Sequence, residues 1–243
     1  MCRLLSFVCA PAVAARVAAD VLPAFTALSC EHKDGWGMAW HDTDGLHTVR
    51  EPQAAHTSTR YADVVSTVTT SAALLHLRLA SPGLAVAEEN SHPFLRDGCA
   101  FGHNGFVGPI GDLDKFHAPD LVAAGSTDSE KYFLSVLTRM RDGEPAHLAL
   151  LSTALDLLDL AETSSANASL LTADALHMVC AYRPGTQPPG RLEDYFTLRY
   201  RAEASAVIVG SDGVARDDWQ RLPNRSVLSV DRVSRRCVVT SGR

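Results

Sequence analysis

The hydrophobic positions of the first half of the chain follow two different periods. Residues 3–9 form an almost continuous apolar run, which predicts a buried strand that starts beside the N-terminus. Pro11 suits the first turn of a helix, and the spacing that follows predicts this helix from Ala12 to about Leu28. Short alternating or apolar segments between Gly, Asp and Pro turns then predict strands at residues 36–41, 46–51, 72–80 and 99–107, with one helix near residues 60–69.

The second half predicts helices first and strands afterwards. Helices are expected at residues 129–141 and 147–162, and strands at residues 168–182, 195–199, 204–210, 226–231 and 236–240. Strands at both ends, with helices between them and no regular βαβ alternation, indicate an α+β fold with antiparallel sheets. The stretch 184–191 (P-G-T-Q-P-P-G-R) is expected to be a loop too short for a domain linker, so residues 1–243 are expected to form a single domain.

The composition of the chain argues against several kinds of partner and cofactor. The chain is 46% hydrophobic and 21% charged, with a net charge of −6 and scattered Lys and Arg, which argues against nucleic acid. The six cysteines include no C-x-x-C pair, so a reducing cytoplasm is expected. The ten histidines lack zincin-like or Cys/His spacing, and neither a metal nor a cofactor is expected.

The N-terminal apolar segment allows a rival interpretation as a signal peptide. Residues 4–15 follow Arg3 and end in small residues, as a cleavable signal would. Only one positive charge precedes them, Pro11 interrupts the run, and no disulfide-dense framework follows, so retention in the cytoplasm is favoured. No apolar stretch is expected to approach the ~20 residues that cross a bilayer, so no membrane partner is expected.

Cys2 is the first residue with distinctive chemistry. Removal of Met1, which is favoured when the next side chain is small, would leave a thiol and a free α-amine on one residue. The thiol is a nucleophile, and the amine, with a reference pKa of ~7.7–8.0, is a base that can take its proton through a water. The alternative is a cysteine that occupies the second position without a function.

A second candidate lies in the apolar segment 74–80 (L-L-H-L-R-L-A). Strand alternation places His76 and Arg78 on the face opposite the leucines at 75, 77 and 79. An arginine in so apolar a strand needs an anion, and its rigid fork of donors suits a carboxylate. A substrate could supply that carboxylate, and the alternative is an internal salt bridge at the sheet surface.

The string G-H-N-G at residues 102–105 ends an apolar strand. Asn-Gly between apolar runs is the strongest short-range hairpin signal, so a type I′ turn is the first interpretation. In the functional interpretation, the Asn104 amide and the Gly105 backbone N–H point together at a developing oxyanion, as acyl transfer requires.

The string T-D-S-E at residues 127–130 fits a capping box, in which Thr127 caps a helix and Glu130 reaches back. Such a cap does not require Asp128, whose carboxylate could accept a substrate ammonium. Two further strings, H-K-D-G-W-G at 32–37 and N-S-H-P-F at 90–94, are interpreted first as a turn and a loop, with no role assigned to Trp36 or His92.

The order of these signals resembles a known family. It comprises M-C-R-L-L at residues 1–5, D-G-W-G at 34–37, H-x-R at 76–78, N-x-H-P-F at 90–94, H-N-G at 103–105 and T-D-S-E-K at 127–131. Together they resemble the class II glutamine amidotransferases, within the branch of stand-alone small proteins, over residues 1 to about 135. Farther on, Ser211-Asp212, Asp217-Asp218-Trp219 and Leu222-Pro223 look like the S-E-P…W…L-P ending of the same branch, from which Asp212-Gly213 departs.

The resemblance implies an N-terminal-nucleophile (Ntn) hydrolase fold, a four-layer αββα sandwich of two antiparallel sheets with Cys2 at the end of a central strand. Cys2 would be the nucleophile and, through its amine, the base. Asn104 and Gly105 would form the oxyanion hole. Arg78 would bind the substrate α-carboxylate and Asp128 its α-ammonium.

One departure concerns the recognition of the carboxylate. Family members fused to synthase domains follow the arginine with W-A-T-H-G, whereas residues 79–83 of this chain are L-A-S-P-G. Pro82 therefore replaces their histidine. The Ser81 hydroxyl is a candidate substitute for the lost donor.

The resemblance implies hydrolysis of the γ-glutamyl amide bond of glutamine or a γ-glutamyl compound, with release of glutamate and no cofactor. One alternative is a glutaminase subunit that delivers ammonia to a separate synthase. An alternative from another class is a non-catalytic regulatory or ligand-binding module on the same fold. The expected partner is a small γ-glutamyl substrate, with a synthase or a homo-oligomer as further options.

Overall fold

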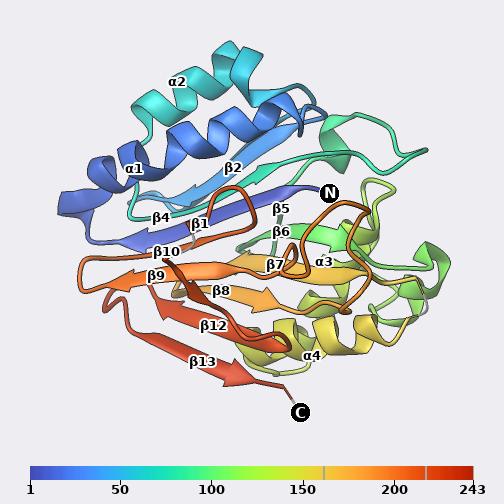
Figure 1. The fold of residues 1–243 in the computed structure, drawn as a ribbon. Coiled ribbons are helices and arrows are strands. Elements are labelled where there is room, and N and C mark those ends of the chain that lie inside the picture. The colour runs from blue at the N-terminus through green and yellow to red at the C-terminus, as the bar shows by residue number, and fades with distance from the viewer. Residues whose placement is uncertain (161, 217, 243) are drawn as a thin grey trace.

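Two stacked β-sheets lie between two pairs of helices in a computed structural model, which describes residues 1–160, 162–216 and 218–242 (Figure 1). Within these residues, one sheet has seven strands and the other has six, and every pairing between neighbouring strands is antiparallel. The seven-stranded sheet has the order β11 (Gln220–Arg221), β9 (Arg199–Glu203), β10 (Ala206–Gly210), β1 (Arg3–Cys9), β4 (Ala72–Leu77), β2 (Trp36–His41), β3 (Leu46–Glu51). The six-stranded sheet has the order β13 (Cys237–Ser241), β12 (Ser226–Asp231), β8 (Ala175–Cys180), β7 (Ser165–Leu171), β6 (Cys99–Phe106), β5 (Phe94–Arg96).

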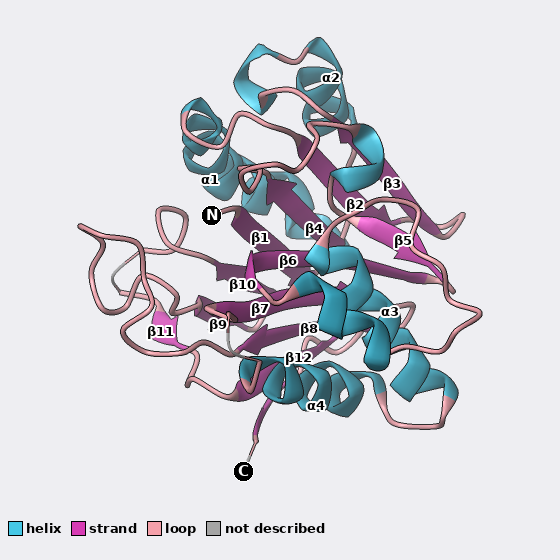
Figure 2. Cartoon of the chain, turned by 90° about the vertical axis from the view of Figure 1, so that its right-hand side faces the viewer, coloured by secondary structure: helices cyan, strands magenta, loops and turns pink. Residues whose placement is uncertain are grey.

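Each sheet is covered on its outer face by two helices. Helices α1 (Ala14–Ala27) and α2 (Thr59–Thr67) cover the seven-stranded sheet, whereas α3 (Asp128–Arg141) and α4 (Ala146–Leu158) cover the six-stranded sheet (Figures 1 and 2). Apolar side chains fill the three spaces between these four layers. This is the α+β sandwich that the sequence predicted. Short 3-10 helices are η1 (Pro11–Val13), η2 (Leu28–Cys30), η3 (Ala55–Thr57), η4 (Glu88–Asn90) and η5 (Ile110–Lys115).

Strand β1 occupies the centre of its sheet, between β10 and β4, and all seven of its side chains are buried. Leu5 and Phe7 pack toward the helices, whereas Val8 packs between the two sheets. Burial on both faces explains why the strand is an almost continuous apolar run rather than an alternating one. Its N-terminal end carries Cys2.

Several predicted boundaries are wrong because turns interrupt apolar runs. Segment 168–182 comprises the second half of β7 and all of β8, with Thr172 N–H donating to the Ala175 carbonyl at 2.9 Å in the turn between them. The strand expected at 195–199 is instead a pair of turns that leads into β9. Helix α4 ends at Leu158, four residues before the predicted end, and Ala161 lies outside the described residues.

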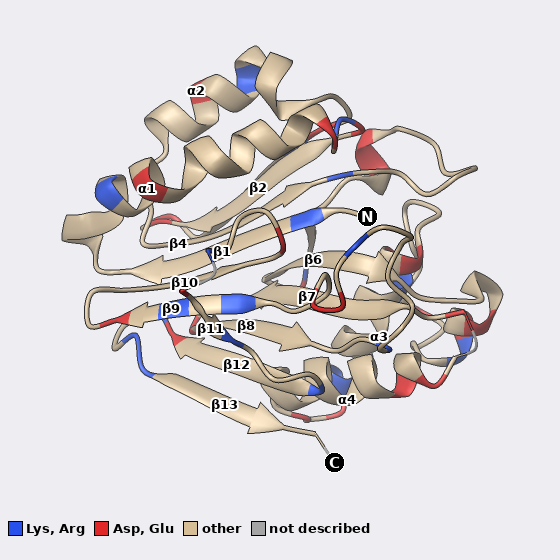
Figure 3. Ribbon diagram, viewed as in Figure 1, with Lys and Arg blue, Asp and Glu red and all other residues tan. Residues whose placement is uncertain are grey.

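Helix α1 and its flanking turns correct the expectation about apolar length. The run Pro11–Cys30 has 20 residues and a mean hydropathy of 1.4, long and apolar enough to cross a bilayer by length and composition. In this fold its apolar face packs against the seven-stranded sheet through Val17, Val21 and Phe25. Figure 3 shows the basic positions dispersed among acidic ones over helices, loops and strands, with one at the N-terminal end of β1.

Candidate active site

A cavity of about 260 Å³ lies where β1 begins, where β4 ends and where β6 leads toward α3. Figure 2 views the molecule from the side that carries this N-terminal end of β1. The lining of the cavity includes five of the six site residues that the sequence predicted, whereas Asn104 is not among the lining residues. These five are Cys2, Arg78, Ser81, Gly105 and Asp128.

Cys2 directly precedes β1 and is 8% exposed. Its thiol donates a long hydrogen bond to the Leu79 carbonyl, with a Sγ–O distance of 3.7 Å. Burial raises the pKa of the Cys2 thiol, and burial lowers the pKa of the Met1 α-amine next to it. Met1 itself lines the cavity, so its removal would enlarge the space beside the thiol.

Arg78 comes directly after β4, and the turn backbone fixes its position. Its backbone N–H donates to the Gly35 carbonyl at 2.7 Å, and its carbonyl accepts from Asp34 N–H at 3.0 Å. The side chain is 3% exposed, yet both terminal guanidinium nitrogens are buried without a hydrogen-bond partner within the described residues. Burial lowers the pKa of this guanidinium. Among those same residues no salt bridge involves Arg78, so the internal ion pair considered as an alternative has no counterpart.

Asp128 ties the end of β6 to the start of α3. One carboxylate oxygen accepts from Val107 N–H at 2.8 Å, and the other lies 3.2 Å from the Ser129 hydroxyl oxygen. The helix cap is Thr127, whose hydroxyl accepts from Glu130 N–H at 3.1 Å as predicted.

The second half of the predicted capping box is wrong. The Glu130 carboxylate accepts from the N–H groups of Ala124 and Gly125, at 2.8 and 2.7 Å, rather than from the cap residue. It therefore closes the loop that precedes the helix. The loop presents two backbone N–H groups to this one carboxylate. The Glu130 side chain therefore satisfies two donors, whereas in a capping box it would satisfy one.

Asn104 and Gly105 lie inside β6, opposite Asn167 and Ala166 of β7. The predicted hairpin turn is therefore wrong, because the chain runs straight on to Phe106 and the strand that pairs with β6 comes from far along the sequence. A Cβ atom at Gly105 would lie 1.9 Å from the Ser165 carbonyl oxygen, so this close approach requires glycine.

Three buried histidines that the sequence analysis left without a role lie around the cavity. His76 donates from Nε2 to the His103 carbonyl at 3.0 Å, which joins the two sheets. His103 donates from Nε2 to the Ser165 carbonyl at 3.0 Å, which leaves Nδ1 to accept from the Ser129 hydroxyl at 2.8 Å in the neutral ring. Burial lowers the pKa of each of the three rings, that of His76 to about 3.

The third ring, His92, lines the cavity itself. All three histidines occur in motifs quoted from the sequence, H-x-R, N-x-H-P-F and H-N-G, so those strings were the available signal. Trp36, the other residue without an assigned role, is buried on β2 and donates from Nε1 to Glu51 at 3.0 Å.

The C-terminal segment braces the strand that carries Cys2. The Ser211 hydroxyl accepts from Leu4 N–H at 3.0 Å, and Asp212 forms a 3.2 Å ion pair with Arg3. Trp219 of the same motif is buried, with the Arg201 guanidinium over its ring at 5.4 Å. Asp217 lies outside the described residues.

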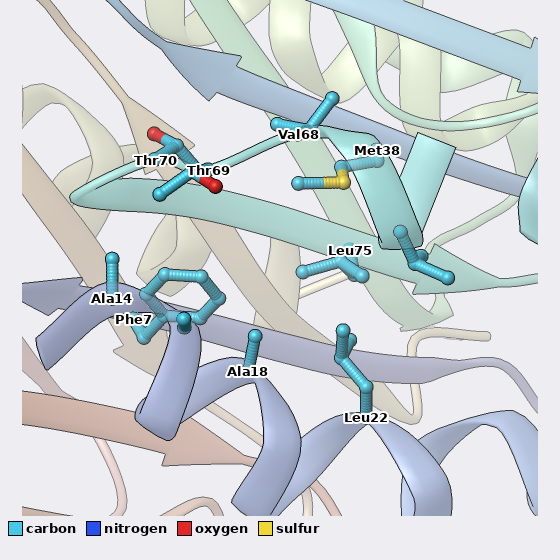
Figure 4. A pocket seen from close by; sticks show the side chains of 11 residues that line it. Phe7, Ala14, Ala18, Leu22, Met38, Val68, Thr69, Thr70 and Leu75 are labelled. Carbon is cyan, nitrogen blue, oxygen red and sulfur yellow. The ribbon is translucent and has the colours of Figure 1, made fainter. Parts of the chain in front are cut away.

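A second cavity lies between α1 and the seven-stranded sheet (Figure 4). Its volume is about 20 Å³, roughly the space of one water molecule. The lining comes from residues such as Phe7, Leu22, Met38 and Leu75 and includes no titratable side chain. Among the described residues, this cavity therefore has no titratable group for acid–base chemistry.

Comparison with protein-family models gives a match to "Glutamine amidotransferases class-II" over residues 1–184. Two curated relatives are similar. "Putative glutamine amidotransferase YafJ" from Escherichia coli is 31% identical over 157 residues, which cover 60% of this chain and 57% of that protein. "Putative glutamine amidotransferase" from Haemophilus influenzae is 36% identical over 109 residues, which cover 42% of this chain and 35% of that protein. The chain thus spans between a third and three fifths of the length of these relatives.

Solved structures share the fold at low sequence identity. A glutamine aminotransferase class-II domain protein from Silicibacter pomeroyi has a TM-score of 0.71 and 20% identity, with 98% of each chain covered. The glutamine phosphoribosylpyrophosphate amidotransferase from B. subtilis, complexed with ADP and GMP, has a TM-score of 0.67 and 16% identity. This chain covers 49% of the latter, so the likeness concerns the fold of that part.

Proposed function

The chain belongs to the class II glutamine amidotransferases, and on that premise we propose that it hydrolyses the γ-glutamyl amide bond of glutamine or a γ-glutamyl compound with Cys2 as nucleophile. One observation carries the proposal. The buried guanidinium of Arg78, which has no partner among the described side chains, lines the same cavity as the Cys2 thiol. A substrate with a carboxylate at one end and an amide at the other would satisfy both groups.

The nucleophile needs a base, because burial raises the pKa of the Cys2 thiol and keeps it protonated near neutral pH. Removal of Met1 would create an α-amine on Cys2 itself. Burial lowers the pKa of the Met1 amine at this end of β1, and the same burial would favour the neutral form of the Cys2 amine, which accepts a proton. The amine would take the thiol proton through a water as Sγ attacks the amide carbon.

The attack would form a tetrahedral intermediate whose oxygen carries the negative charge. The Gly105 backbone N–H and the Asn104 side-chain amide are the proposed donors to this oxyanion. Protonation of the leaving nitrogen by the α-ammonium would break the C–N bond and leave a thioester on Cys2. Water, activated by the same amine, would then hydrolyse the thioester and release glutamate.

The two charges of the α-amino-acid end would select the substrate. Arg78 would hold the α-carboxylate through two parallel hydrogen bonds, and Asp128 would hold the α-ammonium. The Ser81 hydroxyl, on the loop after β4, lines the same cavity and would add a contact to the carboxylate.

Incubation of the purified protein with a panel of γ-glutamyl amides, glutamine included, tests the proposal through release of glutamate. A γ-glutamyl electrophile that alkylates the thiol should add its mass to the peptide that begins with Cys2. Absence of both glutamate release and labelling would instead favour a non-catalytic ligand-binding module on this fold.

Delivery of ammonia to a separate synthase is the second candidate function. The B. subtilis phosphoribosylpyrophosphate amidotransferase, of which this chain covers about half, is the observation that favours it. Glutamate release that rises sharply when a synthase is added would identify such a partner. The described cysteines are all free, which fits the reducing cytoplasm that we propose as the location.

A further inference from the structure

His92 is a buried residue of the candidate active site whose ring forms no hydrogen bond with any described residue. It lies between η4 and β5, is 4% exposed and lines the cavity that contains Cys2 and Arg78. Neither Nδ1 nor Nε2 has a partner in the part of the chain that the structure describes. A buried polar group without a partner is destabilising, so an imidazole in this position calls for a ligand.

The surroundings of His92 hold the ring in one orientation. It packs at 4.1 Å between ring centroids on His76, and edge to face at 4.6 Å on Phe94. The backbone is equally confined, because a Cβ atom at Gly37 of β2 would lie 2.1 Å from the His92 carbonyl oxygen. The imidazole is therefore positioned before any ligand arrives.

The segment that carries His92 runs beside Arg78. A Cβ atom built at Gly35 would lie 3.0 Å from the Ser91 hydroxyl and 3.5 Å from the Arg78 Cβ, so both residues flank the same point of the turn. Burial, together with the neighbouring histidines and Arg78, holds the pKa of His92 well below 6.5. The ring is neutral and offers one N–H donor.

An anion with more than two acceptor positions can bind Arg78 and His92 at the same time. A carboxylate has about four lone-pair sites, of which the Arg78 fork uses two. Pro82, which lines the same cavity, has no backbone N–H to contribute. We propose that His92 is a substrate-binding residue whose N–H donates to the α-carboxylate held by Arg78. This inference rests on the proposed function, because it places an α-amino-acid end in this cavity.

Ligand binding to a Cys2→Ala background tests the inference without turnover. Alanine is small, so Met1 is expected to be trimmed from this variant as well. Calorimetric titration would compare glutamate with 4-aminobutyrate, which lacks the α-carboxylate, and with glutarate, which lacks the α-amine. His92→Phe removes both ring nitrogens and keeps an aromatic ring, while His92→Asn and His92→Gln each restore an N–H donor near one ring nitrogen.

The expected result is a loss of about tenfold or more in glutamate affinity for His92→Phe, with 4-aminobutyrate affinity nearly unchanged. The preference for glutamate over glutarate should survive, and either the Asn or the Gln variant should recover part of the loss. His177→Phe is the matched control, because His177 is also a buried ring but lies on β8 outside the cavity. The His177→Phe variant should bind the three ligands with the same preferences as the Cys2→Ala protein.

Equal weakening of all three ligands by His92→Phe would overturn the inference and assign His92 to packing. Glutamate release by the wild-type protein, measured in parallel, separates this result from failure of the proposed function. If the wild-type protein releases glutamate from γ-glutamyl amides while His92→Phe keeps the full preference for glutamate over 4-aminobutyrate, the role of His92 alone is refuted. A protein that neither hydrolyses these amides nor binds glutamate would refute both.

Discussion

Asn104 of β6 and Asn167 of β7 lie directly opposite each other in the antiparallel register, yet only Asn167 has its side-chain amide satisfied. Its Nδ2 donates to the Phe196 carbonyl at 2.5 Å, and its Oδ1 accepts from Ala181 N–H at 2.8 Å. The Oδ1 of Asn104 is buried without a partner among the described residues. Asn167 is therefore the candidate for a structural role and Asn104 the candidate for a functional one.

Asn104→Ala is expected to lower kcat by about 10²–10³, with little change in KM, because it deletes one proposed oxyanion donor. Asn167→Ala is the control and should lower the melting temperature, since it leaves the Phe196 carbonyl and the Ala181 N–H unpaired. Steady-state kinetics and thermal unfolding of both variants distinguish a catalytic role of Asn104 from a structural one. If Asn104→Ala melts early but turns over normally, the residue supports the sheet and not the reaction.

The active protein is expected to begin at Cys2, because the mechanism needs a free α-amine beside the thiol. Intact-mass analysis of active protein should show the loss of Met1. Cys2→Ala should abolish turnover and keep the fold, whereas Cys9→Ala, which changes a buried cysteine at the other end of the same strand, should keep turnover. Fully active protein that retains Met1 would rule out the α-amine as base.

The pH dependence of kcat/KM should report the α-amine. This group accepts a proton only when it is neutral, so activity should rise as the pH passes upward through its pKa. Burial lowers the pKa of the Met1 amine at this end of β1, and if the Cys2 amine experiences the same burial, the rise should centre at or below the reference range of ~7.7–8.0. Burial moves the pKa of the Cys2 thiol the other way, above the ordinary value of a cysteine. A rise centred above pH 9 would therefore indicate thiol titration.

Arg78→Ala should remove the selection for the α-carboxylate. The wild-type protein should prefer glutamine to 4-aminobutanamide, which lacks that carboxylate, by about tenfold or more, because the buried guanidinium would otherwise remain unpaired. The variant should use both amides about equally poorly. An unchanged preference with a lower melting temperature would assign Arg78 to stability.

Asp128→Asn should act on the other charge of the same substrate. Its amide oxygen can still accept from Val107 N–H, so the link between β6 and α3 is kept while the negative charge is lost. The preference for glutamine over 5-amino-5-oxopentanoate, which lacks the α-amine, should fall, and the selection for the carboxylate should remain. Kinetics of both single variants and the double variant measure whether the two effects are independent.

Gly105→Ala should destabilise the protein by about 1–3 kcal/mol or more, because the new Cβ would meet the Ser165 backbone oxygen at 1.9 Å. Gly102→Ala, three residues earlier in β6, is the matched control. Its Cβ would meet only the mobile ends of Leu74 and Leu4, at 3.1 and 3.2 Å. Denaturant unfolding should show a clearly larger loss at Gly105, and equal losses would contradict the close approach.

The sequence by itself determined the main elements and the chemical groups. The apolar run at 3–9, the strands at 36–41 and 46–51 and the four helices were all found, because hydrophobic period and turn residues are local properties of the chain. Five of the six predicted site residues line one cavity. The roles of these residues are still predictions.

Only the tertiary structure decided which segments lie side by side. The Asn-Gly signal at 104–105 failed because strand pairing depends on partners distant in sequence, and β7, some sixty residues later, extends β6 through that point. The unpaired state of Arg78 and His92 is likewise invisible in the sequence, because it depends on every group that the fold brings near them. The residue type determines which chemistry is possible. Long-range packing determines whether the polar groups of that residue are already hydrogen-bonded inside the protein or remain unpaired and able to bind a ligand.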